Sequence, residues 1–137
     1  MNRKTILLVD DETTQRRRMR HILNDAGYEV IESRDFAEAS AYYQRFEDII
    51  DMLLIDVCLP GNNGCVLAKV ALAGKPQLKV LLMSGNAGAE VCKFYGISAT
   101  DVHFLAKPFR EPDLLARVRY LLDTPAASGK VAGATVT

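Results

Sequence analysis

The sequence predicts an α/β protein with a doubly wound, five-stranded parallel sheet. Strand-like and helix-like stretches alternate from residue 5 to about residue 122. Three of the strand-like stretches are nearly unbroken apolar runs, as expected of strands that helices cover on both faces. At 137 residues the chain is most simply one domain, long enough to bury a single core.

The expected strands lie near residues 5–10, 28–32, 51–56, 78–83 and 102–106. For an alternation of this length we expect the flavodoxin-like strand order 2-1-3-4-5. This order places the first strand beside the third. Residues that follow these two strands in the chain should therefore meet in space.

The helices are expected between the strands. Gly27 should end the first helix, and Asp35 with Glu38 resembles a capping box for a second helix through about Phe46. A third helix is expected from near Gly64 to Gly74, and a short, mobile one within residues 87–96. Pro112 fits the first turn of the last helix. The residues expected to face the core are Met19, Ile22, Leu23 and Ala26 in the first helix, Val66, Leu67, Val70 and Ala71 in the third, and Leu114, Leu115, Val118, Leu121 and Leu122 in the last.

The composition limits the partners that we expect for the protein and indicates its expected location. Lysine plus arginine (17) equals aspartate plus glutamate (17), so net charge gives no general attraction to nucleic acid or to anionic membranes. No apolar stretch approaches the roughly 20 residues that span a bilayer, and the N-terminus lacks the pattern of a signal peptide. We expect one cytoplasmic domain over residues 1–123, followed by a disordered tail over residues 124–137.

The three cysteines have no metal-ligand spacing. Cys58, Cys65 and Cys92 lack paired CxxC spacing and nearby histidines, which argues against a zinc site and against a disulfide framework. Cys65 and Cys92 are expected to be small apolar filler in the core. Cys58 lies two residues after Asp56 and is expected at the mouth of any pocket there.

Polar residues follow four of the predicted strands at the point where each strand ends. Asp10 and Asp11 follow the first strand, Asp56 the third, Ser84 the fourth and Lys107 the fifth. The carboxyl ends of parallel strands lie along one edge of a sheet, where open α/β sheets bind their ligands. The sequence therefore predicts one pocket that holds three carboxylates, a hydroxyl and an ammonium group.

These residue types suit phosphoryl transfer. Three carboxylates within a few ångströms need a compensating cation, and Mg2+ prefers carboxylate oxygens and substrate phosphates. An aspartate accepts a phosphoryl group as an acyl phosphate, and we assign this role to Asp56. Lys107 and the Ser84 hydroxyl would then each contact one phosphoryl oxygen.

The motifs resemble those of response-regulator receiver domains. They are Leu7-Leu8-Val9-Asp10-Asp11-Glu12, Asp56-Val57-Cys58-Leu59-Pro60-Gly61-Asn62-Asn63-Gly64, Leu82-Met83-Ser84-Gly85 and Phe104-Leu105-Ala106-Lys107-Pro108-Phe109. The resemblance covers residues 5 to about 122, and the segment from Ser84 to Phe109 is most similar to C-terminal receivers of hybrid sensor histidine kinases. It implies Mg2+ held by Asp10, Asp11, Asp56 and the backbone carbonyl of Cys58. It also implies a cis Lys107–Pro108 peptide bond.

The resemblance implies a signalling role rather than a metabolic enzyme. Asp56 would take its phosphoryl group from the phosphohistidine of a sensor histidine kinase or a histidine phosphotransfer protein. Ser84 and Phe104 would then switch the face formed by the fourth helix, the fifth strand and the last helix. Output would pass to a downstream protein or a tethered domain, with no direct contact to nucleic acid or membrane. Arg16, Arg17, Arg18 and Arg20 on the first helix are either a solvated face or part of the surface for the phosphotransfer partner.

Several alternatives stay open at this point. One alternative is that Asp10 and Asp11 merely cap the first helix. Residues 10–14 also resemble the strand-end motif of haloacid-dehalogenase-type phosphatases, in which Asp10 would be the nucleophile. A flavodoxin-like nucleotide-binding protein is disfavoured because acids replace a glycine-rich phosphate loop after the first strand. A receiver-like domain that binds a partner without phosphorylation is the remaining alternative.

Overall fold

Five parallel strands form the centre of the protein in the computed structural model, which describes residues 3–85, 88–97 and 102–123. The sheet order is β2-β1-β3-β4-β5, as the sequence predicted. In chain order the elements are β1 (Thr5–Val9), α1 (Thr13–Asp25), β2 (Glu29–Ser33), α2 (Phe36–Phe46), β3 (Met52–Asp56), α3 (Gly64–Gly74), β4 (Lys79–Ser84), α4 (Gly88–Phe94), β5 (His103–Ala106) and α5 (Glu111–Asp123).

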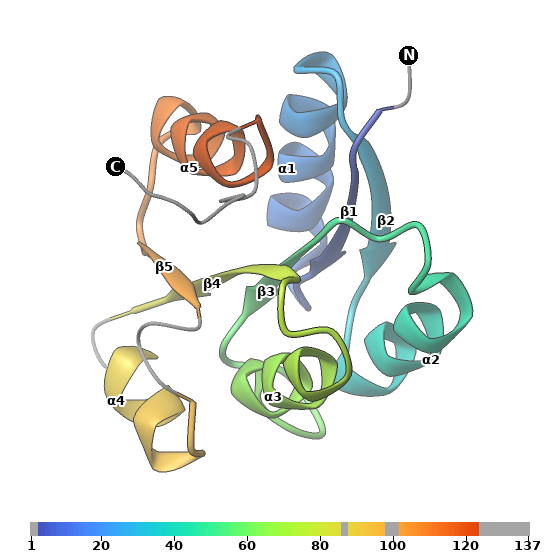
Figure 1. Ribbon diagram of the computed structural model, residues 1–137. Coiled ribbons are helices and arrows are strands. Elements are labelled where there is room, and N and C mark those ends of the chain that lie inside the picture. The colour runs from blue at the N-terminus through green and yellow to red at the C-terminus, as the bar shows by residue number, and fades with distance from the viewer. Residues whose placement is uncertain (1–2, 86–87, 98–101, 124–137) are drawn as a thin grey trace, which may run out of the picture.

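Helices cover both faces of the sheet. Figure 1 shows α1 and α5 side by side on one face and α2, α3 and α4 on the other. Alternate residues of β1 point to opposite faces, so Ile6 and Leu8 pack with Met19 and Leu23 of α1. Leu7 and Val9 pack into the cluster beneath α2, α3 and α4. The central strands β1, β3 and β4 are buried on both faces, which explains their continuous apolar runs.

The predicted helix ends are confirmed. Gly27 follows α1 with a φ of 102°, a conformation that favours glycine and ends the helix. Asp35 caps α2, and its carboxylate accepts a hydrogen bond of 2.8 Å from the Glu38 backbone N–H. Glu38 in turn accepts from the Arg34 N–H at 2.9 Å, so the two acids act together at this helix start.

Five core predictions need qualification. Ala26 and Val66 are only half-buried, and Val70 is 64% exposed, so its predicted place in the core is wrong. The reason is that α3 is apolar on most of its surface, and its buried stripe is formed by Gly64, Cys65, Leu67, Ala68 and Ala71. Periodicity cannot choose between two adjacent apolar stripes. In α1 and α5, Ile22 and Leu115 are half-buried at the edges of their stripes.

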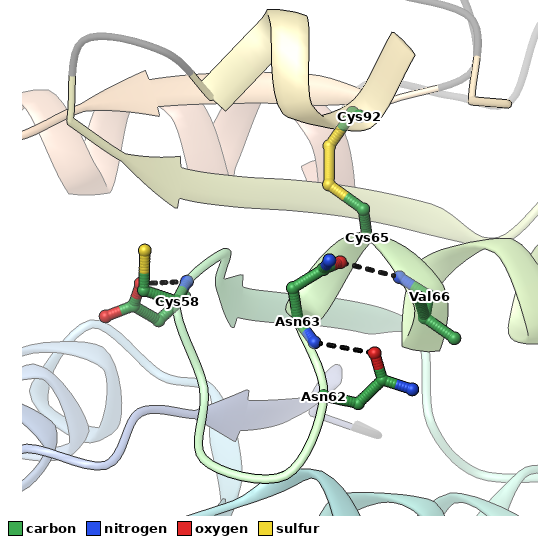
Figure 2. The surroundings of a disulfide bond; sticks show 7 residues. Cys58, Asn62, Asn63, Cys65, Val66 and Cys92 are labelled. Atoms are coloured by element: carbon green, nitrogen blue, oxygen red, sulfur yellow. Dashed lines mark hydrogen bonds between the residues drawn. A yellow bond between two sulfur atoms is a disulfide. The ribbon is translucent and has the colours of Figure 1, made fainter. Parts of the chain in front are cut away.

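The expectation that Cys65 and Cys92 are separate apolar fillers is wrong. Both side chains are buried in the core, but they form a disulfide between α3 and α4, with their Cα atoms 5.3 Å apart. Figure 2 shows this bond spanning the two helices. Cys58 is a free, exposed cysteine.

The remaining expectations concern the short helix, the tail and the membrane. The short helix predicted within residues 87–96 corresponds to α4, which has seven residues; its mobility stays a prediction. The tail predicted over residues 124–137 lies outside the described residues. Within the described part of the chain, every helix is too short or too polar to cross a bilayer.

Candidate functional site

Three carboxylates meet at the C-terminal edge of the sheet. Ligand oxygens of Asp10, Asp11 and Asp56 lie within 4.8 Å of one another. Asp10 is fully buried and Asp56 is only 6% exposed, whereas Asp11 is exposed. Strands β1 and β3 are adjacent and parallel, so residues that follow or end them necessarily lie at the same edge.

The two buried aspartates have the same local geometry. In each, one carboxylate oxygen accepts a hydrogen bond of 2.9 Å from the backbone N–H two residues later, which is that of Glu12 for Asp10 and of Cys58 for Asp56. Such a side-chain turn is typical of aspartate at the end of a strand. It fixes each carboxylate and leaves the second oxygen available for another partner.

The second oxygen of Asp10 fits a metal ion. Asp10 Oδ2 is buried and has no hydrogen-bond partner in the described structure, which is costly for a carboxylate oxygen. The two other acids stand beside it. All-oxygen ligand sets of this kind suit Mg2+, which also keeps several waters. The residues present therefore fit the cation that the sequence implied.

The electrostatics agree with a cation site. Burial raises the pKa of the Asp10 carboxyl above its ordinary value, and the nearby charge of Asp56 raises it further. The Glu12 N–H and the Lys107 ammonium oppose this shift without cancelling it. Without a metal, burial and the neighbouring negative charges therefore disfavour the ionised form of Asp10, and a divalent cation would relieve this.

Lys107 supplies the one ammonium that contacts the carboxylates within the described residues. Its Nζ donates to Asp56 Oδ2 at 2.6 Å, across 51 residues of sequence. Burial lowers the pKa of Lys107, but its hydrogen bond to Asp56 and the charges of Asp56 and Asp10 raise it above its ordinary value overall. The ammonium is therefore held in its charged form. The Lys107–Pro108 bond is cis, as the resemblance implied.

Ser84 and Phe104 also lie where the sequence placed them. Ser84 is the last residue of β4, is 8% exposed, and its carbonyl accepts a hydrogen bond of 2.8 Å from the Lys107 N–H. This bond joins the ends of β4 and β5. Phe104 lies on β5, is half-buried and packs against the core cluster on the α3 and α4 side.

The alternative that the first two acids merely cap α1 is not supported. The N-cap of α1 is Glu12, whose carboxylate accepts from the Gln15 N–H at 2.6 Å. Asp10 and Asp11 are therefore not needed as caps. Their proximity to Asp56 instead gives them a shared site.

The arginines of α1 divide into two groups. Arg16 and Arg20 form ion pairs with Glu32 of β2, at 2.9 Å and 2.6 Å. Arg16 also donates to the Asp10 carbonyl at 3.0 Å, which ties the acidic loop to α1. Arg17 and Arg18 are exposed. Arg18 lines a groove between α1 and the segment that follows β5, together with Gln15, Met19, Ile22, Lys107, Pro108, Phe109 and Glu111.

Comparison with known proteins identifies the family. The family model "Response regulator receiver domain" matches residues 6–119, which is most of the chain. The chain belongs to this family. Members of this family are phosphoacceptor domains of two-component signalling, and the chain is one of them.

Individual relatives agree with this assignment. The chain is 31% identical over 126 residues to the aerobic respiration control protein ArcA of Escherichia coli, covering 92% of this chain and 51% of that protein. It is 32% identical to the phosphate regulon transcriptional regulatory protein PhoB of Pseudomonas aeruginosa over 120 residues, 87% of this chain and 52% of PhoB. The chain thus spans about half the length of these curated relatives.

Solved structures show the same fold. The receiver domain of the hybrid histidine kinase CckA matches with a TM-score of 0.71 and 32% identity, covering 86% of this chain and 98% of that one. Chemotaxis response regulator CheY4 of Vibrio cholerae matches with a TM-score of 0.75 and 28% identity, covering 88% of this chain and all (100%) of CheY4.

The phosphatase alternative is not supported. The receiver family model accounts for residues 6–119. Within the site, Asp10 is fully buried, whereas the lysine contacts Asp56. A nucleophile at Asp10 would lack this direct hydrogen bond from Lys107.

Two residues, Gly64 and Arg16, have supporting roles that the sequence did not predict. Gly64 begins α3 so close to β3 that an added Cβ would lie 2.4 Å from the Asp56 carbonyl oxygen. Arg16 supports the Asp10 backbone. For Gly64, a glycine at a helix start directly after a polar loop was a signal available in the sequence. The pairing of Arg16 with Glu32 depends on a tertiary contact, which sequence pattern does not reveal.

Proposed function

We propose that Asp56 accepts a phosphoryl group from a phosphohistidine. The observation that carries this proposal is the 2.6 Å contact between Lys107 Nζ and Asp56 Oδ2 beside the three-carboxylate cluster. In the proposed step a carboxylate oxygen of Asp56 forms a bond to phosphorus. The bond between phosphorus and the donor imidazole nitrogen breaks, and the nitrogen keeps the electron pair and takes up a proton.

Asp10, Asp11, Asp56 and the backbone carbonyl of Cys58 are proposed to hold Mg2+. When bound, the cation would neutralise negative charge on the transferred phosphoryl group. The protein's part is to hold these oxygens in place through the turns at Asp10 and Asp56. A further support is the Arg16 contact to the Asp10 carbonyl.

Lys107 and Ser84 are proposed to stabilise the phosphoryl group. The ammonium of Lys107 contacts Asp56 already, and a charge-assisted hydrogen bond to a phosphoryl oxygen would replace this contact. The Ser84 hydroxyl would bind a second oxygen from the neighbouring strand end. Lys107 already lies beside the acceptor, so little reorganisation of its ammonium group is needed during transfer.

The output is proposed to pass through the face of α4, β5 and α5. Movement of Ser84 toward the phosphoryl group would draw the half-buried Phe104 inward, since the two strand ends are joined by the Lys107–Ser84 backbone bond. Phe104 lacks a hydroxyl, so its position would depend on packing alone. A swing from mostly inactive to mostly active requires roughly 3–5 kcal/mol of differential stabilisation.

The partner that delivers the phosphoryl group is proposed to be a sensor histidine kinase or a histidine phosphotransfer protein. The groove beside Lys107 carries the exposed Arg18, and Arg17 is exposed on the same helix. Basic side chains next to the site favour approach of a phosphorylated, acidic partner. We also propose a cytoplasmic location, a receiver unit over residues 1–123, and output through another protein or a tethered domain.

The catalysis proposed for the chain is limited to its own phosphorylation and to slow loss of the phosphoryl group. Incubation of the 137-residue chain with acetyl phosphate and Mg2+ tests the proposal, with phosphorylation followed by intact mass. We expect one phosphoryl group on the wild type and at least 100-fold less on Asp56→Asn. The exposed Asp48 provides the control, and Asp48→Asn should be labelled like the wild type. Full labelling of Asp56→Asn at another residue would refute the assignment.

A further inference from the structure

The disulfide joins the helix beside the acceptor to the helix of the proposed output face. Cys65 is the second residue of α3 and Cys92 lies within α4. Both are almost completely buried, at 0% and 1% exposure. Figure 2 places the bond between the two helices, while Cys58 lies on the loop before α3 and away from the bond.

Cys92 is the main attachment of α4 to the core. Among the described side chains of this helix, Cys92 alone is fully buried; Val91 is half-buried, and Glu90, Lys93 and Phe94 are exposed. With Cys92 as the one buried side chain among residues 90–94, the described part of this seven-residue helix has little apolar area to hold it in place. A covalent bond at that side chain therefore decides how far α4 is able to move.

The other end of the bond is close to the acceptor. Gly64, next to Cys65, donates its backbone N–H to the Val57 carbonyl at 2.8 Å. A Cβ at Gly64 would be 2.4 Å from the Asp56 carbonyl oxygen and 2.6 Å from Ile55 Cγ2, so the start of α3 is packed directly against β3. The disulfide thus links α4 to a rigid element that touches the backbone of Asp56.

The same core cluster contains the proposed switch residue. Phe104 packs against the cluster of which Cys65 and Cys92 are members. Val91 of α4 packs against it too. An inward movement of Phe104 must therefore be accommodated by the side chains around this bond, because protein cores are closely packed.

We propose that Cys65 and Cys92 form a thiol–disulfide site that controls the phosphorylation switch. This inference rests on the proposed function. In the oxidised form the bond holds α4 against α3 in the arrangement that the structure shows. In the reduced form α4 is free to adjust to phosphorylation. Cytoplasmic disulfides in most organisms are transient and serve catalysis or redox sensing, which favours a regulatory role over a structural one.

The redox step is an exchange with a small-molecule disulfide. The Cys65–Cys92 bond forms, the bond in the reagent breaks, and the two cysteine protons leave with the two thiols that the reagent becomes. Because both sulfurs are buried, exchange requires local opening of α4. By thermodynamic reciprocity, a state of Asp56 that favours movement of α4 also favours reduction of the bond.

The test measures binding of beryllofluoride, a phosphoryl mimic, with Mg2+ to the full chain in both redox states. Protein is oxidised with glutathione disulfide or reduced with dithiothreitol, and the linked peptides containing Cys65 and Cys92 are confirmed by mass spectrometry. Calorimetry should show at least about fivefold tighter binding to the reduced form, the lower end of typical coupling between two sites. The variant Cys65→Ala/Cys92→Ala, which keeps Cys58, should show no dependence on the reagent.

Each other outcome is decisive. Equal affinities in the two redox states, tighter binding by the oxidised form, or no Cys65–Cys92 link after oxidation would overturn the inference and leave the proposed function standing. Absence of beryllofluoride binding in both states would overturn the proposed function and this inference with it. If the variant Cys65→Ala/Cys92→Ala does not fold, the comparison of oxidised with reduced wild type still tests the inference.

Discussion

The two halves of the sheet's C-terminal edge are built differently. On the β1 and β3 half, Asp10 and Asp56 follow or end central strands, are buried, and are each fixed by a backbone N–H two residues later. On the β4 and β5 half, β5 has four residues at the sheet edge, α4 has seven, and Phe104 is only half-buried. The carboxylates proposed to bind metal are therefore on the half with central, buried strands, and the proposed response is on the half with the shorter elements.

This difference shows how one small domain combines precise chemistry with movement. Phosphoryl transfer needs oxygens held within a few tenths of an ångström, which central buried strands supply. A switch needs an element with two arrangements of similar free energy, and such elements come from the less stable parts of a fold. Lys107 connects the two halves, because it directly follows β5 and its ammonium group contacts Asp56 of β3.

Breaking the connection between the halves should have the largest effect. Lys107→Ala removes the ammonium that contacts Asp56, and we expect roughly 10–100-fold slower labelling by acetyl phosphate, because such charged hydrogen bonds contribute about 1.5–3 kcal/mol. Any labelled variant should also fail to alter the α4–β5–α5 face. The control Lys4→Ala removes an exposed lysine before β1, at the opposite end of the strands, and should behave as the wild type in a mass-based labelling assay.

A methyl group at the start of α3 should distort the half with central, buried strands. Gly64→Ala would place a Cβ against the Asp56 carbonyl, and we expect a loss of about 1–3 kcal/mol in the free energy of unfolding together with weaker labelling. Gly74→Ala, at the other end of the same helix, has open space and should change stability by less than about 1 kcal/mol. Urea denaturation of both variants measures the difference. Equal stabilities would mean that α3 is not packed tightly against the acceptor.

Neutralising Asp10 should stabilise the metal-free protein while removing its response to metal. The raised pKa of Asp10 means that the folded protein keeps this proton to higher pH than the unfolded chain does, so ionisation costs stability as pH rises through that pKa. We expect Asp10→Asn to gain on the order of 1 kcal/mol at pH 7 without metal. Thermal melts with and without Mg2+ should show stabilisation of the wild type only. Equal Mg2+ stabilisation of both would remove Asp10 from the proposed ligands.

The smallest effect is expected for a substitution on β5, His103→Gln, which should alter the pH dependence of stability. Burial and the charges of Arg117 and Lys79 lower the pKa of His103. His103 therefore binds a proton more readily in the unfolded chain than in the folded protein. The contribution of the neutral imidazole to stability is present above about pH 6.5 and is lost as the pH falls below that value. His103→Gln should flatten the loss of stability between pH 7 and 5 by less than about 1 kcal/mol, because the residue is exposed. Identical pH profiles of the two proteins would contradict this.

The site was predictable from sequence because its geometry follows from topology. Asp56 and Lys107 are 51 residues apart, yet both follow strands of one parallel sheet, and strand order alone brings them together. The cap at Asp35 and the stop at Gly27 were predictable for a different reason, since they depend on local backbone conformation.

What the sequence did not reveal depends on how elements pack against each other. The Cys65–Cys92 bond needs α4 to lie against α3 at one particular rotation, and neither spacing nor hydrophobicity specifies that. Val70 was assigned to the core for the same reason, because α3 offers two apolar stripes and only packing selects one. The support of Asp10 by Arg16 likewise follows from the position of α1 relative to β2.

The most direct test of the central claim is the location of the phosphoryl group. After acetyl phosphate treatment with Mg2+, borohydride reduction converts an aspartyl phosphate to homoserine, which peptide mass spectrometry locates. The account predicts homoserine at residue 56, dependent on Mg2+ and on Lys107. Homoserine at residue 10 or 11, or labelling unchanged by removal of Mg2+, would contradict it.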